Sequence, residues 1–301
     1  VYPNGEADVN RFAAAGGPGF VFRELMDAGL MHDDLATIAE GGMRAFAQEP
    51  RLTDGKVSYV PAAAVSGDKD VVRPANNPFE SQGGLRLLRG NIGRSLIKLS
   101  AVKPQYRSIE APAVVVDAPQ VLNKLHAAGA LPQDFVAVVR YQGPRSNGMP
   151  ELHSLAPLLG LLQNQGRRVA LVTDGRLSGA SGKIPAAIHV TPEASRGGPI
   201  ARIREGDIIR LDGEAGTLEV LVDAAEWAAR GIAANTAPAG TDMGRNLFAM
   251  NRRIVGPADQ GAVSISCGPM HPDGSLWEYD AEYDLGHDAA AAAAPHEAKD
   301  A

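Results

Sequence analysis

The spacing of apolar and polar residues changes along the chain, from helical spacing near the N-terminus to short apolar runs after about residue 81. Residues 19–30 place apolar side chains near helical spacing and end close to Gly29, a residue typical of helix C-termini. Residues 33–46 form a second helical candidate, interrupted by a pair of glycines. Residues 51–80 are rich in Pro, Asn, Asp and Gly, which predicts a linker and a domain boundary.

From residue 81 to about residue 265, the pattern predicts strands separated by glycine-containing turns. Residues 200–222 in particular predict an antiparallel meander with tight turns at 205–206 and 212–216. The predicted strands are 95–100, 112–117, 135–141, 168–173, 186–190, 200–204, 207–212 and 217–222.

Helices are predicted among and after these strands, at 118–129, 151–165, 223–230 and 240–256. Together the elements predict a mixed α/β fold, mainly a β-barrel-like domain over 81–265 with peripheral helices. The Gly-rich, Pro-rich and Ala-rich sequence of residues 266–301 predicts a disordered tail.

Composition and charge narrow the possible partners. The chain has 301 residues, 45% hydrophobic and 21% charged, as expected for a globular protein with an ample core. Its net charge of −6 disfavours a nucleic-acid or anionic membrane surface. No apolar run approaches the roughly 20 residues that span a bilayer, and no signal-peptide pattern opens the chain. We therefore expect a cytoplasmic protein without nucleic-acid or membrane partners.

A single cysteine, Cys267, limits the metal chemistry that the chain can support. It excludes a disulfide framework within the chain. An iron–sulfur cluster usually needs three or four thiolate ligands, so we expect no cluster ligands in this chain.

A Gly- and Ser-rich turn, residues 173–183, is the most informative segment for function. It follows the apolar run 168–172, so the sequence predicts a strand that ends in exposed backbone N–H groups and hydroxyls. Ser178 lies in this turn. From chemistry alone it either satisfies the turn or acts as a nucleophile or base, and no His or Asp lies at a triad-like local spacing.

A carboxylate follows a proline at Glu151, where the predicted helix 151–165 begins. It could simply complement the positive end of the helix dipole. It could also bind Mg²⁺, which prefers hard oxygen ligands, although one carboxylate does not make a site.

Charged and polar residues flank these two positions. Arg176 and Lys183 are either candidate contacts for an anionic substrate or solvated surface charges. Asp174 is expected to hold the turn through side-chain-to-backbone bonds, and His153 to pack on the leucine-rich helix. His189 lies in an apolar run, and this pattern favours a histidine that is buried in the core. The basic residues that could meet a phosphate are Arg11, Arg86, Arg89, Arg94, Arg176 and Lys183.

Several long segments, in order, resemble the dihydroxy-acid dehydratase/6-phosphogluconate dehydratase family. The 22 residues TDGRLSGASGKIPAAIHVTPEA are similar to the family's active-site segment. The segments 1–20, 83–102, 111–117 and 147–160 agree, and three of them resemble the phosphogluconate branch more than the dihydroxy-acid branch. The resemblance covers roughly residues 1–265 and implies the C-terminal half of the family's usual length. Residues 1–80 would then be a remnant of a larger N-terminal α/β domain plus a linker.

The resemblance implies a hydro-lyase that removes water from a phosphorylated sugar acid. Ser178 would be the base that takes the proton beside the carboxylate, and Glu151 would bind Mg²⁺. Arg176, Ser181 and Lys183 would contact the substrate. A cluster, 4Fe-4S by the resemblance, would help the hydroxyl leave, with its ligands in the N-terminal half. The full-length protein is expected to be a homodimer. The alternatives are a dehydratase of another sugar acid or of a branched dihydroxy acid, or a non-catalytic barrel module.

Overall fold

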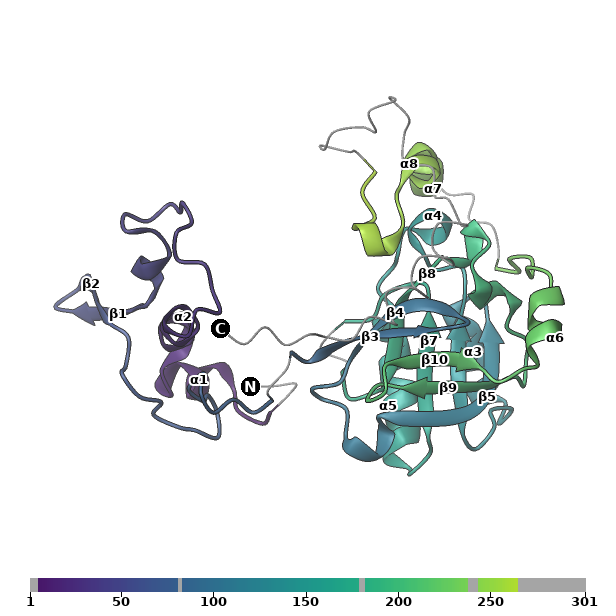
Figure 1. Cartoon of the computed structure of the whole chain (residues 1–301), viewed down its shortest axis with the longest axis horizontal. Helices are drawn as coiled ribbons and strands as arrows, with labels where there is room; N and C mark the ends of the chain where they lie inside the picture. Colours follow the sequence, from purple (N-terminus) through teal and green to yellow (C-terminus); the bar gives the residue numbers. More distant parts are fainter. Residues whose placement is uncertain (1–4, 81–82, 179–181, 238–242, 265–301) are drawn as a thin grey trace, which may run out of the picture. The chain divides into compact units, whose positions relative to one another are not determined.

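A computed structural model describes residues 5–80, 83–178, 182–237 and 243–264 (Figure 1). The predicted tail, 266–301, lies outside the described residues. The chain divides into two compact units, Val1–Gly84 and Leu85–Ala301.

The first unit is small and partly helical. It contains α1 (Val9–Ala14), α2 (Gly17–Asp27), a 3₁₀ turn η1 (Gly42–Phe46), β1 (Gln48–Thr53) and β2 (Lys56–Pro61). Helix α2 confirms the predicted first helix, and Gly29 follows it with a left-handed φ of 68°. The hydrophobic core of this unit consists of Ala7, Ala15, Phe20, Val71 and Val72.

Two predictions for this unit are wrong. The second helix, 33–46, is reduced to η1, because Gly41 and Gly42 both adopt left-handed φ values of 90° and 64° that an α-helix cannot contain. The predicted linker contains the antiparallel hairpin of β1 and β2. Asp54 and Gly55 lie at its turn with φ of 51° and 75°, so an Asp-Gly hairpin signal was present and was misread as loop composition.

The second unit confirms the predicted barrel with peripheral helices. Eight strands close in the order β10-β3-β4-β8-β7-β6-β5-β9. The strands are β3 (Leu85–Gly90), β4 (Gly93–Lys98), β5 (Ser108–Val116), β6 (Phe135–Val139), β7 (Val169–Thr173), β8 (Ala186–Thr191), β9 (Ile208–Asp212) and β10 (Thr217–Val220).

Two differences from the predicted strands have clear causes. Strand β3 was not predicted, because the adjacent Leu87 and Leu88 obscure its alternation, although Leu88 alone points into the core. Residues 200–204 were predicted to be a strand. They instead belong largely to the 3₁₀ turn η6 (Pro199–Arg202), which Pro199 begins.

Strands β5, β6, β7 and β8 form a parallel half of the barrel. Helices α3 (Pro119–Ala127) and α5 (Ala156–Asn164) connect the first three strands and cover their outer face. Alternate residues of β6 therefore enter two cores: Val136 and Val138 fill the barrel, while Phe135 and Val139 pack against the helices. This double burial explains why these strands are continuous apolar runs.

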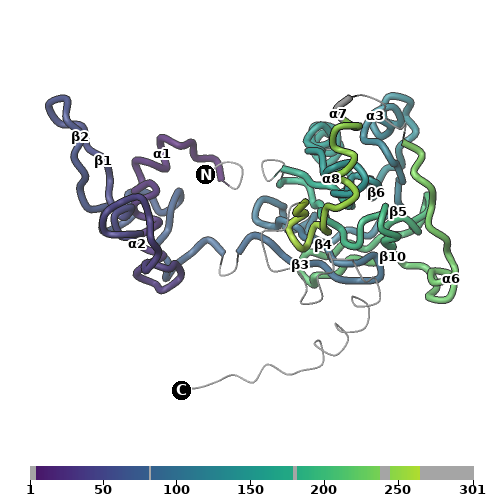
Figure 2. The backbone as a smooth tube through the Cα atoms, turned by 90° about the horizontal axis from the view of Figure 1, so that it is seen from above, coloured from purple at the N-terminus to yellow at the C-terminus, as the bar shows by residue number. Residues whose placement is uncertain are grey.

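The described chain after β10, residues 221–237 and 243–264, is called the C-terminal arm, and its short helices lie outside the barrel (Figures 1 and 2). They are α6 (Ala224–Ala229), α7 (Met243–Leu247), α8 (Ala249–Ile254) and the 3₁₀ turn η7 (Ala258–Gln260). The predicted helix 240–256 is thus broken at Phe248, and residues 240–242 lie outside the described residues. The longest described helix has 11 residues, and none in the described part of the chain is long and apolar enough to cross a membrane.

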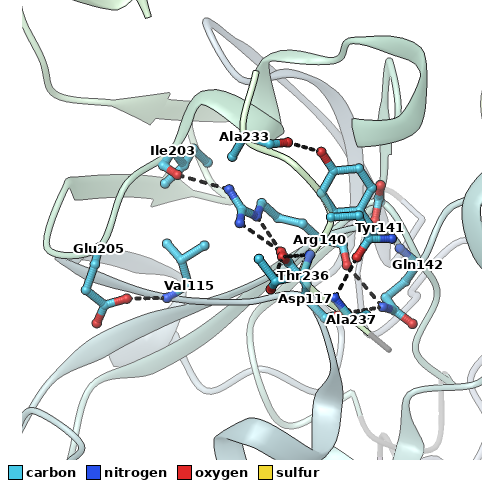
Figure 3. A network of polar contacts seen from close by, with 12 residues as sticks. Val115, Asp117, Arg140, Tyr141, Gln142, Ile203, Glu205, Ala233, Thr236 and Ala237 are labelled. Carbon is cyan, nitrogen blue, oxygen red and sulfur yellow. Dashed lines mark hydrogen bonds and ion pairs between the residues drawn. The ribbon is translucent and has the colours of Figure 1, made fainter. Parts of the chain in front are cut away.

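A buried ion pair links two parallel strands to this arm (Figure 3). Asp117, directly after β5, accepts hydrogen bonds from Nε and Nη2 of Arg140, directly after β6, each at 2.8 Å. Its second oxygen accepts bonds from the backbone N–H and the hydroxyl of Thr236 at 2.9 and 2.6 Å. The Tyr141 hydroxyl donates to the carbonyl of Ala233. The arm is therefore anchored at the carboxyl ends of the parallel strands.

We predict that Asp117→Ala lowers the free energy of unfolding by about 3–5 kcal/mol, because it leaves the Arg140 cation buried without its partner. The matched control is Glu110→Ala. Glu110 pairs with Arg210 at 3.0 Å, but both side chains are about half exposed, so its loss should cost less than about 1 kcal/mol. Urea denaturation of both variants measures the difference. Equal effects would mean that the buried pair contributes no more than a surface pair.

Candidate active site

The loop after β6 and the loop after β7 meet beside the end of β7. Glu151 and Arg176 form an isolated parallel bridge, and the N–H of Leu152 donates to the carbonyl of Arg176 at 3.2 Å. This short pairing brings together two segments that are 25 residues apart in the chain.

The contact between Glu151 and Ser178 is the centre of the site. Oε1 of the exposed Glu151 accepts a hydrogen bond from the backbone N–H of the half-buried Ser178 at 2.8 Å. The two residues with the strongest sequence-based predictions are therefore neighbours. Their assigned roles, base and metal ligand, stay predictions.

Gly175 permits this close approach. A Cβ at this position would lie 2.7 Å from Cβ of Gln142 and 3.3 Å from Cδ1 of Leu152. The first distance is far below van der Waals contact, so any side chain would push the loop of residues 142–151 away from the end of β7.

His189 borders the site in an unexpected conformation. It lies within β8 with a left-handed φ of 57°, and its N–H donates to the carbonyl of Gly175 at 2.9 Å. The sequence favoured a core histidine, but the side chain is only half-buried. Burial and then the nearby Arg176 cation lower the pKa of His189, which favours a neutral imidazole. A non-glycine residue with positive φ inside a strand leaves no signal in the sequence.

The other predicted contacts are only partly placed. Arg176 and Lys183 are exposed on the loop after β7, and Ser181 lies outside the described residues. His153 is exposed, and its packing on the leucine-rich helix stays a prediction. Two predicted phosphate ligands are engaged elsewhere, Arg11 with Asp68 at 3.0 Å and Arg94 with Asp259.

Asp174 is fully buried at the start of the same loop. Its two oxygens accept backbone N–H bonds from Gln142 at 2.8 Å and from Ala194 at 2.9 Å. Burial, and to a smaller extent the nearby Glu193, raise the pKa of Asp174 to about 6 against the effect of these bonds. Asp174 thus holds loops together by side-chain-to-backbone bonds, over a longer range than the turn that the sequence suggested.

The donor set near Glu151 fits one ligand of a hard cation. A carboxylate has lone pairs on both oxygens and remains able to bind Mg²⁺ after accepting one N–H. Among the residues that the structure describes, no group of three or more His, Cys, Asp or Glu side chains could hold a metal ion. Cys267 lies outside the described residues, and one cysteine does not fit an iron–sulfur cluster.

The raised pKa of Asp174 predicts a specific pH dependence of stability. The folded protein binds the proton more tightly than the unfolded chain, whose Asp pKa is 3.8, so stability falls as pH rises from about 4 to about 6. We predict that wild type loses about 1.4 kcal/mol of its free energy of unfolding, relative to Asp174→Asn, as the pH rises from about 5 to about 7.5.

Urea denaturation of both proteins at the two pH values measures this shift. The pKa of the neighbouring Glu193 is also raised by burial, but Glu193 is present in both proteins. Parallel pH profiles for wild type and variant would contradict the prediction.

Comparison with known proteins identifies relatives that match most of this chain in sequence. A family model described as dihydroxy-acid/6-phosphogluconate dehydratase C-terminal matches residues 70–262. The chain is 51% identical over 266 residues to phosphogluconate dehydratase of Pseudomonas aeruginosa and 53% identical over 270 residues to that of Rhizobium meliloti. These matches cover 88% and 87% of this chain but only 44% and 43% of the relatives.

A dihydroxy-acid dehydratase of Sulfurisphaera tokodaii is more distant, with 33% identity over 267 residues, covering 88% of this chain and 45% of the relative. The chain therefore spans less than half the length of the curated relatives it matches. The family match extends over the whole barrel and includes both Glu151 and Ser178. The chain belongs to the dihydroxy-acid/6-phosphogluconate dehydratase family and contains its C-terminal domain.

Proposed function

We propose that this chain supplies half of the active site of a hydro-lyase that dehydrates 6-phosphogluconate to 2-keto-3-deoxy-6-phosphogluconate in the full-length protein. The observation that carries the proposal is the 2.8 Å contact between Glu151 and Ser178. The phosphogluconate dehydratases among the relatives, at about 50% identity, support this substrate over a branched dihydroxy acid.

In this proposal Ser178 removes the proton at C2, next to the substrate carboxylate. A serine hydroxyl is a weak base, and the negative charge of Glu151 beside it disfavours the alkoxide further. Glu151 would therefore act as a metal ligand, so that a net positive field replaces its own negative charge. Mg²⁺, when bound, stabilises the negative charge that develops on the enolate.

Three further residues of the chain would bind and orient the substrate. Arg176 is exposed beside Glu151 and can meet an anionic group of the substrate. We propose the same role for Ser181 and Lys183. The lowered pKa of His189 disfavours a second positive charge next to Arg176.

The departure of the C3 hydroxyl is not assigned to this chain. A cluster as Lewis acid would need ligands from other residues, because the chain has one cysteine. We propose that these ligands and the remaining Mg²⁺ ligands belong to the additional length of the relatives. We also propose that the full-length protein is a cytoplasmic homodimer.

We predict that Ser178→Ala in the full-length protein reduces kcat by about 10⁴-fold or more, at the upper end for a proton-transfer group. The folded structure should be retained, because the change removes one hydroxyl from a half-buried loop. The matched control is Ser154→Ala, which changes an exposed serine of the 3₁₀ turn η3 (His153–Leu155) and should keep wild-type activity. A Ser178→Ala enzyme within tenfold of wild type would assign Ser178 to the turn alone.

We predict that the full-length protein prefers 6-phosphogluconate over gluconate by about 10²-fold or more in kcat/KM. A phosphate can form charge-assisted hydrogen bonds, each worth about 1.5–3 kcal/mol, and its loss would leave cationic groups unpaired. Steady-state kinetics with 6-phosphogluconate, gluconate and a branched dihydroxy acid measure the preference. Equal rates on gluconate would contradict the phosphorylated substrate, and faster turnover of the branched acid would favour the other branch of the family.

A further inference from the structure

The loop that carries Glu151 is held at its start by two buried carboxylates from other strands. Asp174 follows β7 and accepts the N–H of Gln142 at 2.8 Å. Glu193 follows β8 and accepts the N–H of Arg145 at 3.0 and 3.1 Å, and that of Ser146 at 3.4 Å. Both side chains are almost fully buried, with 0% and 3% exposure.

The fit between Glu193 and the loop is too close for any side chain at residue 143. A Cβ on Gly143 would overlap the Glu193 carboxylate. The φ of Gly143 is −65°, which every residue can adopt, so the glycine is required by space and not by backbone conformation. The Glu193 carboxylate therefore lies directly against the N-terminus of the short helix α4 (Pro144–Asn147).

The same loop is held at its other end by the candidate site itself. Gly148 and Met149, with φ of 75° and 52°, turn the chain toward Glu151, which accepts the N–H of Ser178. Ser178 lies only four residues after Asp174. The contacts thus form a closed circuit from Asp174 to Gln142, along the loop to Glu151, across to Ser178 and back to Asp174.

We propose that Asp174 and Glu193 are positioning residues that set the distance between Glu151 and Ser178. Neither touches the substrate in this proposal, and both act through the backbone of residues 142–146. The effect on the site geometry is independent of the reaction; only the effect on turnover rests on the proposed function.

A purely packing role does not explain these side chains. Burying a carboxylate is costly, and apolar residues of similar volume usually stabilise a core at least as well. An ionised carboxylate offers acceptors on both oxygens, whereas an amide offers one oxygen and places an N–H₂ donor on the other side. In Asp174→Asn, one of the two backbone N–H groups must therefore lose its acceptor.

Hydrogen exchange of backbone amides in the 301-residue chain, followed by NMR at neutral pH, tests the proposal without any assay of activity. We expect Asp174→Asn and Glu193→Gln to speed exchange of the Ser178 amide by about 10- to 100-fold, the loss that corresponds to one charge-assisted hydrogen bond. Gly143→Ala should do the same by displacing the Glu193 carboxylate. The matched control is Asp212→Asn, because Asp212 accepts the N–H of Ala215 at 2.8 Å in the turn between β9 and β10.

The proposal is overturned if the amides of Gln142, Arg145 or Ala194 exchange faster in the variants while the Ser178 amide does not. It is also overturned if Asp212→Asn accelerates the Ser178 amide equally, since the effect would then be general destabilisation. If Asp174→Asn does not fold, exchange in Gly143→Ala and in the wild type tests the proposal instead. In the wild type the Gln142, Ala194 and Ser178 amides should open together as denaturant is added, and separate opening overturns the proposal.

A kinetic measurement on the full-length protein separates this inference from the proposed function. If the wild type dehydrates 6-phosphogluconate, Gly143→Ala should lower kcat at least tenfold and weaken activation by Mg²⁺. The melting temperature and the activity of Asp212→Asn show how much activity is lost through general destabilisation alone. Wild-type kinetics in Gly143→Ala would overturn the positioning role. An inactive wild type would refute the proposed function and leave the exchange result to decide this inference.

Discussion

The four parallel strands are followed by buried polar residues, and most of the structure around the site depends on the hydrogen bonds and ion pairs that these residues form. Asp117 follows β5, Arg140 follows β6, Asp174 follows β7 and Glu193 lies just beyond β8, all between 0% and 7% exposed. Because carboxyl ends of parallel strands meet at one edge of a sheet, these charges are gathered in one region. A buried charge without a partner costs several kcal/mol, so each must bind a fixed backbone group or an opposite charge. The loops at this edge are therefore constrained far more tightly than surface loops usually are.

This constraint explains how a hydrogen bond between an exposed carboxylate and a loop amide can be well defined. In isolation, the contact between Glu151 and Ser178 would compete with water and contribute little. Here the loop before Glu151 is tied to Asp174 and Glu193, and the loop before Ser178 begins at Asp174 itself. Gly175 then lets the two loops approach closely. The conformational entropy of both segments is lost when the barrel folds, so the site gains a geometry that its own contact could not impose.

The parallel strands of the barrel and the importance of residues 173–183 could be predicted from the sequence, because doubly buried strands leave continuous apolar runs and a Gly-rich turn marks where one ends. Ser178 and Glu151 could be identified, but their roles came only from resemblance. Side-chain-to-backbone bonds were predicted for Asp174, but the distant partners of Asp174 and Glu193 could not be, since a carboxylate that accepts N–H groups from residues 20 to 48 positions away leaves no local pattern. The hairpin of β1 and β2 was missed for another reason: its Asp-Gly turn was read as linker composition. The left-handed φ of His189 is imposed by tertiary contacts alone.

The charge of Glu151 bears directly on the chemistry that we propose for Ser178. The Glu151 carboxylate accepts the N–H of Ser178, and Arg176, two residues before Ser178, is exposed and therefore screened by solvent. Burial and Arg176 lower the pKa of His189, which disfavours a positive charge on its imidazole. The negative charge of Glu151 beside Ser178 raises the cost of forming a serine alkoxide. The scaffold supplies the geometry. In the function that we propose, a cation held on Glu151, together with ligands from outside the described residues, would supply the positive field that activates Ser178.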